Sequence, residues 1–279
     1  MPVTRPTDLD EALHTLAEEP ATHVLAGGTD MMVEITFGHR RREHVLALRR
    51  IRELQGFEVE DDRIRLGAML TYTGVERDLA PLAPALAMAA RTVGSPQIRN
   101  AGTVGGNLGT ASPAGDTLPW LLALDAEVEL ASVRGRRQVP LASCITGPKR
   151  TAREPDELIT AVTVPRVRGP QHAAKIGPRN AMVISVACVA VVLDEDARTV
   201  RVGLGAVGPT PLRVPEAERE VADAIDWEAL RCPDEAIGAF GRACAAAAEP
   251  IPDHRSTAAY RRHAVGILAS RSLRRCLHR

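Results

Sequence analysis

The chain has 279 residues, 45% of them apolar and 25% charged, an ordinary composition for a globular protein that excludes a disordered chain. Its 35 basic and 35 acidic residues give a formal net charge of zero, which argues against a general nucleic-acid binder because such proteins carry a basic excess. Aromatic residues make up only 3%, so few rings are available to stack on a ligand.

The first part of the chain mixes helical and strand patterns. Apolar residues at helical intervals predict a first helix that Thr7 caps and that ends at Pro20. The next patterns predict short strands at 24–25 and 45–48, a hairpin over 57–66 and a helix over 82–93. The glycine-rich, almost uncharged stretch 95–116 then predicts a long loop. Loops of this length inside a compact domain are usually functional or disordered, and the small apolar residues here argue against disorder.

The rest of the chain predicts strands followed by helices. A helix is expected at 117–124, strands at 128–130, 138–139 and 158–164, a linker at 165–170 and an antiparallel pair at 182–193 and 199–207. Helices are expected at about 215–223 and 234–248, and a last one, capped by Ser256, runs to about 277. A division near residue 170 separates an α+β first part from a second part of strands and then helices.

The chain contains no stretch near the roughly 18 apolar residues that cross a bilayer, and no secretory signal is recognisable, so no membrane span is expected. Five cysteines are scattered without a C-x-x-C pair, which argues against an iron–sulfur cluster or structural zinc on this chain. We expect them to be reduced, in a cytoplasmic protein. They are Cys144, Cys188, Cys232, Cys244 and Cys276.

Two glycine pairs are the strongest candidates for a binding site. Gly27-Gly28, followed by Thr29, comes directly after a predicted strand, where successive N–H groups can form an anion-binding concavity. The alternative is a tight strand-to-helix turn that binds nothing. The stretch 103–107 repeats the Gly-Gly feature and adds a threonine hydroxyl and an asparagine amide. Two such loops in one domain suggest a shared pyrophosphate clamp.

Two charged residues have open alternatives. Asp116 precedes a predicted helix, where it either caps the helix or accepts hydrogen bonds from a ribose or from a cofactor ring. Lys175, one of two lysines, is either a solvated surface residue or an ammonium that meets a phosphate or a flavin carbonyl. The stretch 203–208 matches G-x-G-x-x-G, but Pro209 and Pro211 forbid the helix that a dinucleotide fingerprint needs, so a strand end and a turn are expected.

The C-terminal region is rich in arginine. Seven arginines and no acidic residue occur from 255 to 279. Nucleic-acid binding, a helix face that meets a partner subunit, and a solvated face are the alternatives, and the neutral charge of the whole chain favours the last two.

No histidine has metal-ligand spacing and no catalytic triad is recognisable, so neither a metal site nor a catalytic residue is predicted.

The glycine motifs carry a family resemblance. Ala-Gly-Gly-Thr-Asp at 26–30, the stretch 97–107 and Ser-Pro-Ala-Gly-Asp at 112–116 resemble, in this order and spacing, the FAD-binding medium subunit of the molybdenum hydroxylases, which include xanthine dehydrogenases and aerobic carbon monoxide dehydrogenases. The stretches 156–159, 175–179 and 260–264 also fit, so the resemblance covers essentially the whole chain.

The resemblance implies an α+β fold: a vanillyl-alcohol-oxidase or PCMH-type FAD-binding domain of two α/β subdomains, then a small domain of antiparallel strands and helices. The FAD-binding domain would span 1–170, with subdomains of about 1–55 and 56–170, and the C-terminal domain would span 171–279. FAD would lie extended between the subdomains.

The resemblance also assigns the cofactor-binding residues. The pyrophosphate would be held by Leu25, Ala26, Gly27, Gly28, Thr29, Asp30, Met31, Met32, Thr103, Val104, Gly105, Gly106 and Asn107. Ser112 and Asp116 would bind the cofactor, Leu158 or Ile159 would lie near the isoalloxazine, and Lys175 would contact the flavin end.

The function that the resemblance implies is electron transfer within a multi-subunit oxidoreductase. Electrons would come from 2Fe-2S clusters on one partner, after substrate oxidation at molybdopterin on a larger partner, and would leave FAD for NAD, oxygen or a quinone. A stand-alone FAD-dependent oxidase or reductase is the alternative, and a scaffold subunit with a degenerate flavin site is a third. Neither nucleic acid nor a membrane is an expected partner.

Overall fold

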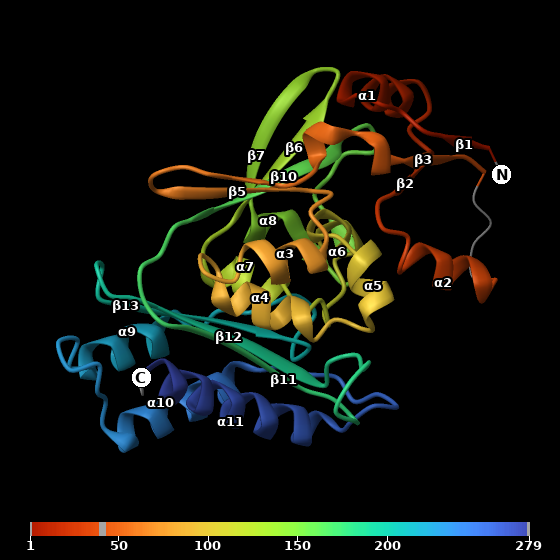
Figure 1. Cartoon of the computed structure of the whole chain (residues 1–279). Coiled ribbons are helices and arrows are strands. Elements are labelled where there is room, and N and C mark those ends of the chain that lie inside the picture. The colour runs from red at the N-terminus through yellow and green to blue at the C-terminus, as the bar shows by residue number, and fades with distance from the viewer. Residues whose placement is uncertain (1, 39–42, 278–279) are drawn as a thin grey trace.

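In the computed structural model, which describes residues 2–38 and 43–277, three larger sheets and a two-stranded ribbon are arranged in successive layers with helices (Figure 1). The expected α+β fold class is confirmed. The five-stranded sheet lies above a layer of helices, and the sheet of the C-terminal region lies below that layer (Figure 1).

The N-terminal lobe is built on a parallel sheet of order β1-β3-β2. Its elements are β1 (Val3–Thr4), α1 (Leu9–Glu18), β2 (His23–Leu25), α2 (Met31–Thr36) and β3 (Val45–Ala47). Helix α1 buries its apolar face as the spacing predicts, but Thr7 is not its cap. Asp8 caps α1 by accepting a hydrogen bond from the backbone N–H of Glu11 at 2.9 Å, because it stands directly before the first helical residue, Leu9.

The second lobe is built on an antiparallel sheet of order β4-β5-β10-β6-β7. Its strands are β4 (Phe57–Val59), β5 (Arg63–Gly67), β6 (Glu127–Ser132), β7 (Gly135–Pro140) and β10 (Leu158–Pro165), which confirms the hairpin and strand predictions. Helices α3 (Tyr72–Asp78), α4 (Pro84–Arg91), α5 (Pro96–Ala101), α6 (Val104–Thr110) and α7 (Leu118–Ala123) pack beside it, and α8 (Leu141–Cys144), β8 (Ile145–Gly147) and β9 (Arg150–Thr151) fill the excursion before β10. Two 3₁₀ turns, Leu48–Arg50 and Arg52–Leu54, link the lobes.

The prediction of a long loop over 95–116 is wrong, because α5 and α6 occupy most of it. Ser95 caps α5, and the hydroxyl of Thr103 caps α6 by accepting from the N–H of Gly106 at 3.0 Å. Gly105 serves close packing, since a Cβ there would lie 2.5 Å from the Cβ of Ala68. The glycines that suggested a loop therefore let a short helix approach the second lobe's sheet.

The C-terminal region has an antiparallel sheet of order β11-β12-β13, made of β11 (Gln171–Ile176), β12 (Ala187–Asp194) and β13 (Thr199–Gly205). Helices α9 (Pro215–Ala224), α10 (Asp234–Ala247) and α11 (Ala258–Leu277) cover one face, and α4 and α7 lie against the other (Figure 1). The second strand begins at Ala187 and not at Met182, and β11 was not predicted. Thr257, not Ser256, accepts the N–H of Tyr260 at the start of α11.

The G-x-G-x-x-G stretch is a strand end, as expected, and its glycines have a packing role. A Cβ at Gly203 would lie 1.8 Å from the carbonyl oxygen of Pro119 in α7, so the sheet touches the helix backbone to backbone. The indole N–H of Trp120 donates to Gln171 at 2.9 Å in the same interface. These contacts join the C-terminal sheet to the second lobe.

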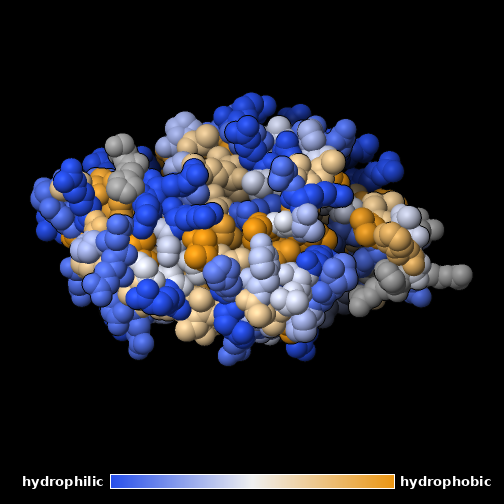
Figure 2. All heavy atoms as spheres, turned by 90° about the horizontal axis from the view of Figure 1, so that it is seen from below, coloured by the Kyte–Doolittle hydropathy of each residue, from blue (hydrophilic) through white to orange (hydrophobic). Residues whose placement is uncertain are grey.

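Most of the C-terminal arginines form internal contacts. Arg262 donates to the carbonyl of Ala248, and Arg274 pairs with Asp234 of α10 at 2.8 Å. Figure 2, a view from below onto the face of α9–α11, shows apolar groups in a band across a largely hydrophilic surface. Arg262 and Arg274 are thus engaged by groups of this chain.

Arg261 anchors the last helix to the sheet. Its side chain is 5% exposed and donates to the carbonyls of Val186 and Ala206 and to Asp253, the last at 2.6 Å. Burial by itself would raise the pKa of Asp253, but hydrogen bonds from Arg255 and Arg261 hold that pKa well below its ordinary value.

Replacing Asp253 with Asn is expected to lower the free energy of unfolding by about 2 kcal/mol at neutral pH, because a buried guanidinium loses its charged acceptor. A carboxyl whose pKa is lowered on folding adds stability above its ordinary pKa and loses it as the pH falls. Urea titrations at neutral and acid pH should therefore show the difference between wild type and variant shrinking in acid. The matched control is Asp234→Asn, whose exposed pair with Arg274 should change stability little.

Candidate functional site

A cavity of about 660 Å³ lies where the β2–α2 loop, helix α6, the start of β10 and the segment after β11 converge. Most of the residues predicted to bind the cofactor line it. They are Leu25, Ala26, Gly27, Gly28, Thr29, Asp30, Met31, Thr103, Gly105, Gly106, Asn107, Ser112, Asp116, Leu158 and Ile159. Segments that are distant in sequence thus form one site.

Three of the predicted residues do not line the cavity. Val104 is fully buried in the core, because α6 turns this side chain toward the sheet. Met32 is half exposed on α2. Lys175 does not line the cavity itself; its ammonium is bonded to Asp116, which does.

The first glycine loop offers a run of free backbone donors. Gly28 has φ +75°, a conformation that favours glycine, and its carbonyl accepts from the N–H of Met32. In the described ranges, the N–H groups of residues 27–31 have no hydrogen-bond acceptor. Successive unpaired N–H groups form an anion-binding concavity, so the geometry agrees with the anion-binding alternative for this loop.

The second glycine cluster is not equivalent to the first. Its N–H groups are already used: Val104 donates to Leu70, Gly105 to Ala68, and both Gly106 and Asn107 to Thr103. The backbone N–H groups of residues 104–107 are therefore not free donors like those of the first loop. Gly106 of this cluster instead gives the cavity wall a position without a side chain, next to the Cβ of Ala26.

Asn107 supplies an oriented amide at the same wall. Its Oδ1 accepts from the hydroxyl of Thr117 at 2.6 Å, which leaves its Nδ2 as the donor, close to Gly115.

Asp116 and Lys175 form a buried ion pair. The side chains are each 10% exposed, the ammonium Nζ lies 2.7 Å from Oδ2, and the hydroxyl of Ser185 donates to Oδ1 at 2.5 Å. Burial raises the pKa of Asp116, against the opposing effect of Lys175 and Ser185. Helix α7 has no side-chain cap, so the capping role proposed for Asp116 is wrong, and so is the solvated surface role for Lys175.

This pair also ties the cavity wall to the C-terminal region. Lys175 lies in β11 and its Nζ donates further to the carbonyl of Val183 at 3.2 Å. The segment 182–184 lines the cavity, with Met182 57% and Ile184 52% exposed. The ion pair therefore fixes how the C-terminal region closes one side of the cavity.

Several lining residues had no sequence signal. Tyr72 is buried, and burial raises the pKa of its hydroxyl above the ordinary value. Lys149 pairs with Glu34 at 2.9 Å, and Arg153 precedes β10. No motif spacing marks these positions, because only the tertiary fold brings them to the cavity. Among residues 2–38 and 43–277, no cluster of His, Cys, Asp and Glu is arranged to hold a metal ion.

Comparisons with known proteins identify the family of the chain. Residues 1–167 match the family described as "FAD binding domain in molybdopterin dehydrogenase", and residues 172–276 match "CO dehydrogenase flavoprotein C-terminal domain". The nicotinate dehydrogenase FAD-subunit of Eubacterium barkeri is 36% identical over 233 residues, covering 78% of each chain. The xanthine dehydrogenase FAD-binding subunit of Escherichia coli O157:H7 is 32% identical, covering 84% of this chain and 83% of that one.

Solved structures show the same fold. Reconstituted CO dehydrogenase from Oligotropha carboxidovorans superposes with a TM-score of 0.91 at 27% identity, over 100% of this chain and 98% of that one. The fold and cavity thus define a flavoprotein of the FAD-binding type. The chain belongs to the family of FAD-binding domains of molybdopterin dehydrogenases, and is an oxidoreductase flavoprotein subunit. This confirms the predicted family and favours it over a stand-alone oxidase or reductase. Within the described part of the chain, no helix is long and apolar enough to span a membrane.

Proposed function

We propose that this chain holds FAD in the cavity and passes electrons from 2Fe-2S clusters on a partner subunit to an external acceptor. The observation that carries the proposal is the run of unpaired N–H donors at residues 27–31, beside a wall that lacks side-chain bulk at Gly106. An extended dinucleotide needs both features, because its pyrophosphate is anionic and must approach the backbone closely.

The proposed roles of the site residues follow from this placement. The loop 27–31 donates to the pyrophosphate, and the Nδ2 of Asn107 donates from the opposite wall. Leu158 and Ile159 supply apolar contact to one of the cofactor's rings. Lys175 acts through Asp116, whose carboxylate it orients on the cavity wall. FAD, when bound, supplies the exchange of electrons between one-electron and two-electron partners.

We propose further that the chain works in an assembly with a 2Fe-2S subunit and a larger molybdopterin subunit in the cytoplasm. Support comes from the relatives' names, which describe FAD subunits and medium chains of dehydrogenases, including the carbon monoxide dehydrogenase medium chain of Hydrogenophaga pseudoflava. Substrate oxidation would occur on the molybdopterin subunit, and NAD, oxygen or a quinone would accept the electrons. The proposed domains are 1–170, divided near residue 55, and 171–279.

The test is flavin binding followed by electron transfer. The full-length chain, stripped of flavin and mixed with FAD, should regain a flavin absorbance band at one FAD per chain, and a reduced 2Fe-2S partner should bleach that band. Failure to bind FAD would contradict the cofactor assignment. Oxidation of an organic substrate by the isolated chain at the rate of the assembly would instead favour a stand-alone oxidase.

A further inference from the structure

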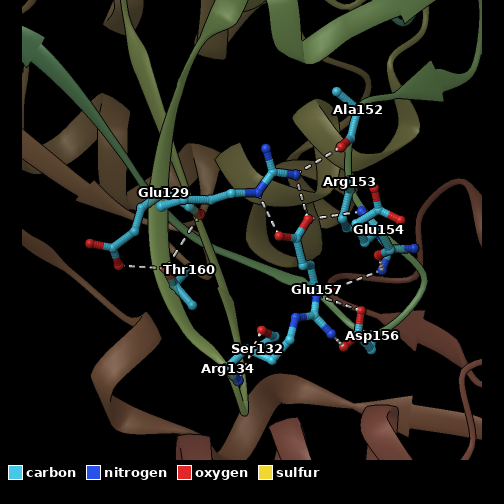
Figure 3. A network of polar contacts seen from close by, with 10 residues as sticks. Glu129, Ser132, Arg134, Ala152, Arg153, Glu154, Asp156, Glu157 and Thr160 are labelled. Atoms are coloured by element: carbon cyan, nitrogen blue, oxygen red, sulfur yellow. Dashed lines mark hydrogen bonds and ion pairs between the residues drawn. The ribbon is translucent and has the colours of Figure 1, made fainter.

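A network of polar contacts holds the segment 152–157, between β9 and β10 (Figure 3), and Arg153 of this segment lines the cavity. The carboxylate of Glu157 accepts from Nε and Nη2 of Arg137, at 2.6 and 2.8 Å, and from the backbone N–H of Glu154. Arg137 also donates to the carbonyl of Ala152. Arg137 of β7 therefore forms hydrogen bonds with both ends of the segment 152–157.

A second contact satisfies the other acidic side chain of this segment. Asp156 forms a two-point ion pair with Arg134, which lies in the turn between β6 and β7 (Figure 3). Hydrogen bonds from Arg134 and Arg137 hold the pKa values of Asp156 and Glu157 below their ordinary range. Both carboxylates are thus paired with arginines other than Arg153.

Arg153 uses only one of its guanidinium nitrogens in the hydrogen bonds of the described residues. Its Nη1 donates to the carbonyls of Glu157, Glu154 and Pro155, at 2.5, 3.1 and 3.2 Å. Its Nε and Nη2 have no partner in the part of the chain that the structure describes, and the residue lines the cavity. Burial lowers the pKa of this guanidinium from its ordinary value, because desolvation disfavours its charge.

The other charged groups along the cavity have partners. Lys149 lies 2.9 Å from Glu34 and 3.9 Å from Asp30, and Asp116 is bonded to Lys175. Arg153 is therefore the lining guanidinium whose free donors a bound anion would satisfy. A fixed guanidinium fork matches the geometry of a phosphate, and such charge-assisted hydrogen bonds are the strong ones.

The position of Arg153 relates it to the first glycine loop. Its Nη1 donates to the carbonyl of Glu157, and the next residue, Leu158, belongs to an apolar cluster against which Val24 and Ala26 pack, Ala26 being the residue before Gly27. The ion pair of Asp116 and Lys175 instead involves the C-terminal sheet. Arg153 is thus linked, through Glu157 and Leu158, to the loop 27–31 and not to the C-terminal sheet.

We propose that Arg153 binds the adenosine diphosphate half of FAD, through Nε and Nη2, and that the ion pairs of Arg134 and Arg137 preorganise the segment that carries it. This inference rests on the proposed function and adds to it a residue that sequence motifs do not mark. The segment is fixed before the cofactor arrives, so little conformational freedom is lost on binding.

The test uses the full-length protein stripped of flavin, with ADP, FAD and riboflavin as separate probes in calorimetric titrations. Arg153→Met is expected to weaken ADP and FAD binding about 10- to 100-fold, the range that one or two charge-assisted hydrogen bonds supply. Riboflavin, which lacks phosphate, should bind unchanged. Arg153→Lys should recover part of the loss, because it restores the charge without the fork.

The matched control is Arg198→Met, which removes an arginine whose exposed pair with Glu228 lies outside both the cavity and the segment 152–157. It should leave ADP affinity unchanged to within about twofold, as expected for an exposed pair. If Arg153→Met binds ADP as wild type does, the inference is overturned while the proposed function stands. If Arg153→Met lost affinity for riboflavin and ADP equally, and Arg153→Lys restored neither, the inference would also be overturned. Arg153 would then only stabilise the conformation of the segment 152–157. If wild type binds none of the three probes, the proposed function itself fails.

Discussion

Replacing Gly27 with alanine is expected to abolish flavin retention by the full-length chain. A Cβ at this position would lie 1.8 Å from the carbonyl oxygen of Ala101 and 3.0 Å from the Cα of Gly102. Both neighbours are backbone atoms at the α5–α6 junction, so neither can rotate away. The β2–α2 loop must therefore move off this junction, which separates the free N–H donors from the wall at Gly106. Overpacking of this kind costs about 1–3 kcal/mol or more.

The measurement is the ratio of flavin absorbance to protein after reconstitution with FAD, together with thermal unfolding. The control is Gly238→Ala in the middle of α10, where the new methyl group would meet only the flexible end of Arg242. Alanine there should raise helix stability by about 0.5–1 kcal/mol and leave flavin content unchanged. A Gly27→Ala protein that retains stoichiometric FAD would contradict the close packing of the β2–α2 loop against the α5–α6 junction.

Elements with local causes could be predicted from the sequence. Helix α1 follows from apolar spacing, and the hairpin of β4 and β5 follows from its turn at Asp61-Asp62. Caps were displaced by one residue at Asp8 and Thr257, because neighbouring residues with short polar side chains compete for the same position. Helix α6 was missed because its glycines suggest a loop, whereas Gly105 is there for packing against Ala68, a contact that local propensity does not reveal.

In the candidate site, too, local motifs were predictable from the sequence and long-range contacts were not. The motifs identified the glycine loops, but the N–H groups of residues 104 and 105 are lost as free donors to acceptors at Leu70 and Ala68, which no spacing reveals. Asp116 and Lys175 are 59 residues apart in sequence, and only the packing of β11 pairs them. Arg153 is one of many arginines, and its role depends on the partners that occupy Asp156 and Glu157.

Replacing Asp116 with alanine is expected to lower the free energy of unfolding by about 3–5 kcal/mol, because it leaves the ammonium of Lys175 buried without its counter-charge. The loss should extend to flavin binding, since Asp116 lies on the cavity wall and its partners Lys175 and Ser185 hold the C-terminal region against that wall. Urea unfolding and FAD titration of the same samples measure both effects.

The double variant Asp116→Ala with Lys175→Met separates charge from shape. It leaves no unpaired charge, so it should recover much of the stability that Asp116→Ala loses, although the contact to Val183 is gone. Glu228→Ala is the matched control, because its pair with Arg198 has nearly the same length, 2.8 Å, but both side chains are more than half exposed. That variant should change stability by less than about 1 kcal/mol. Equal losses in Asp116→Ala and in the double variant would mean that the carboxylate stabilises the wall through Ser185 and not through the buried charge pair.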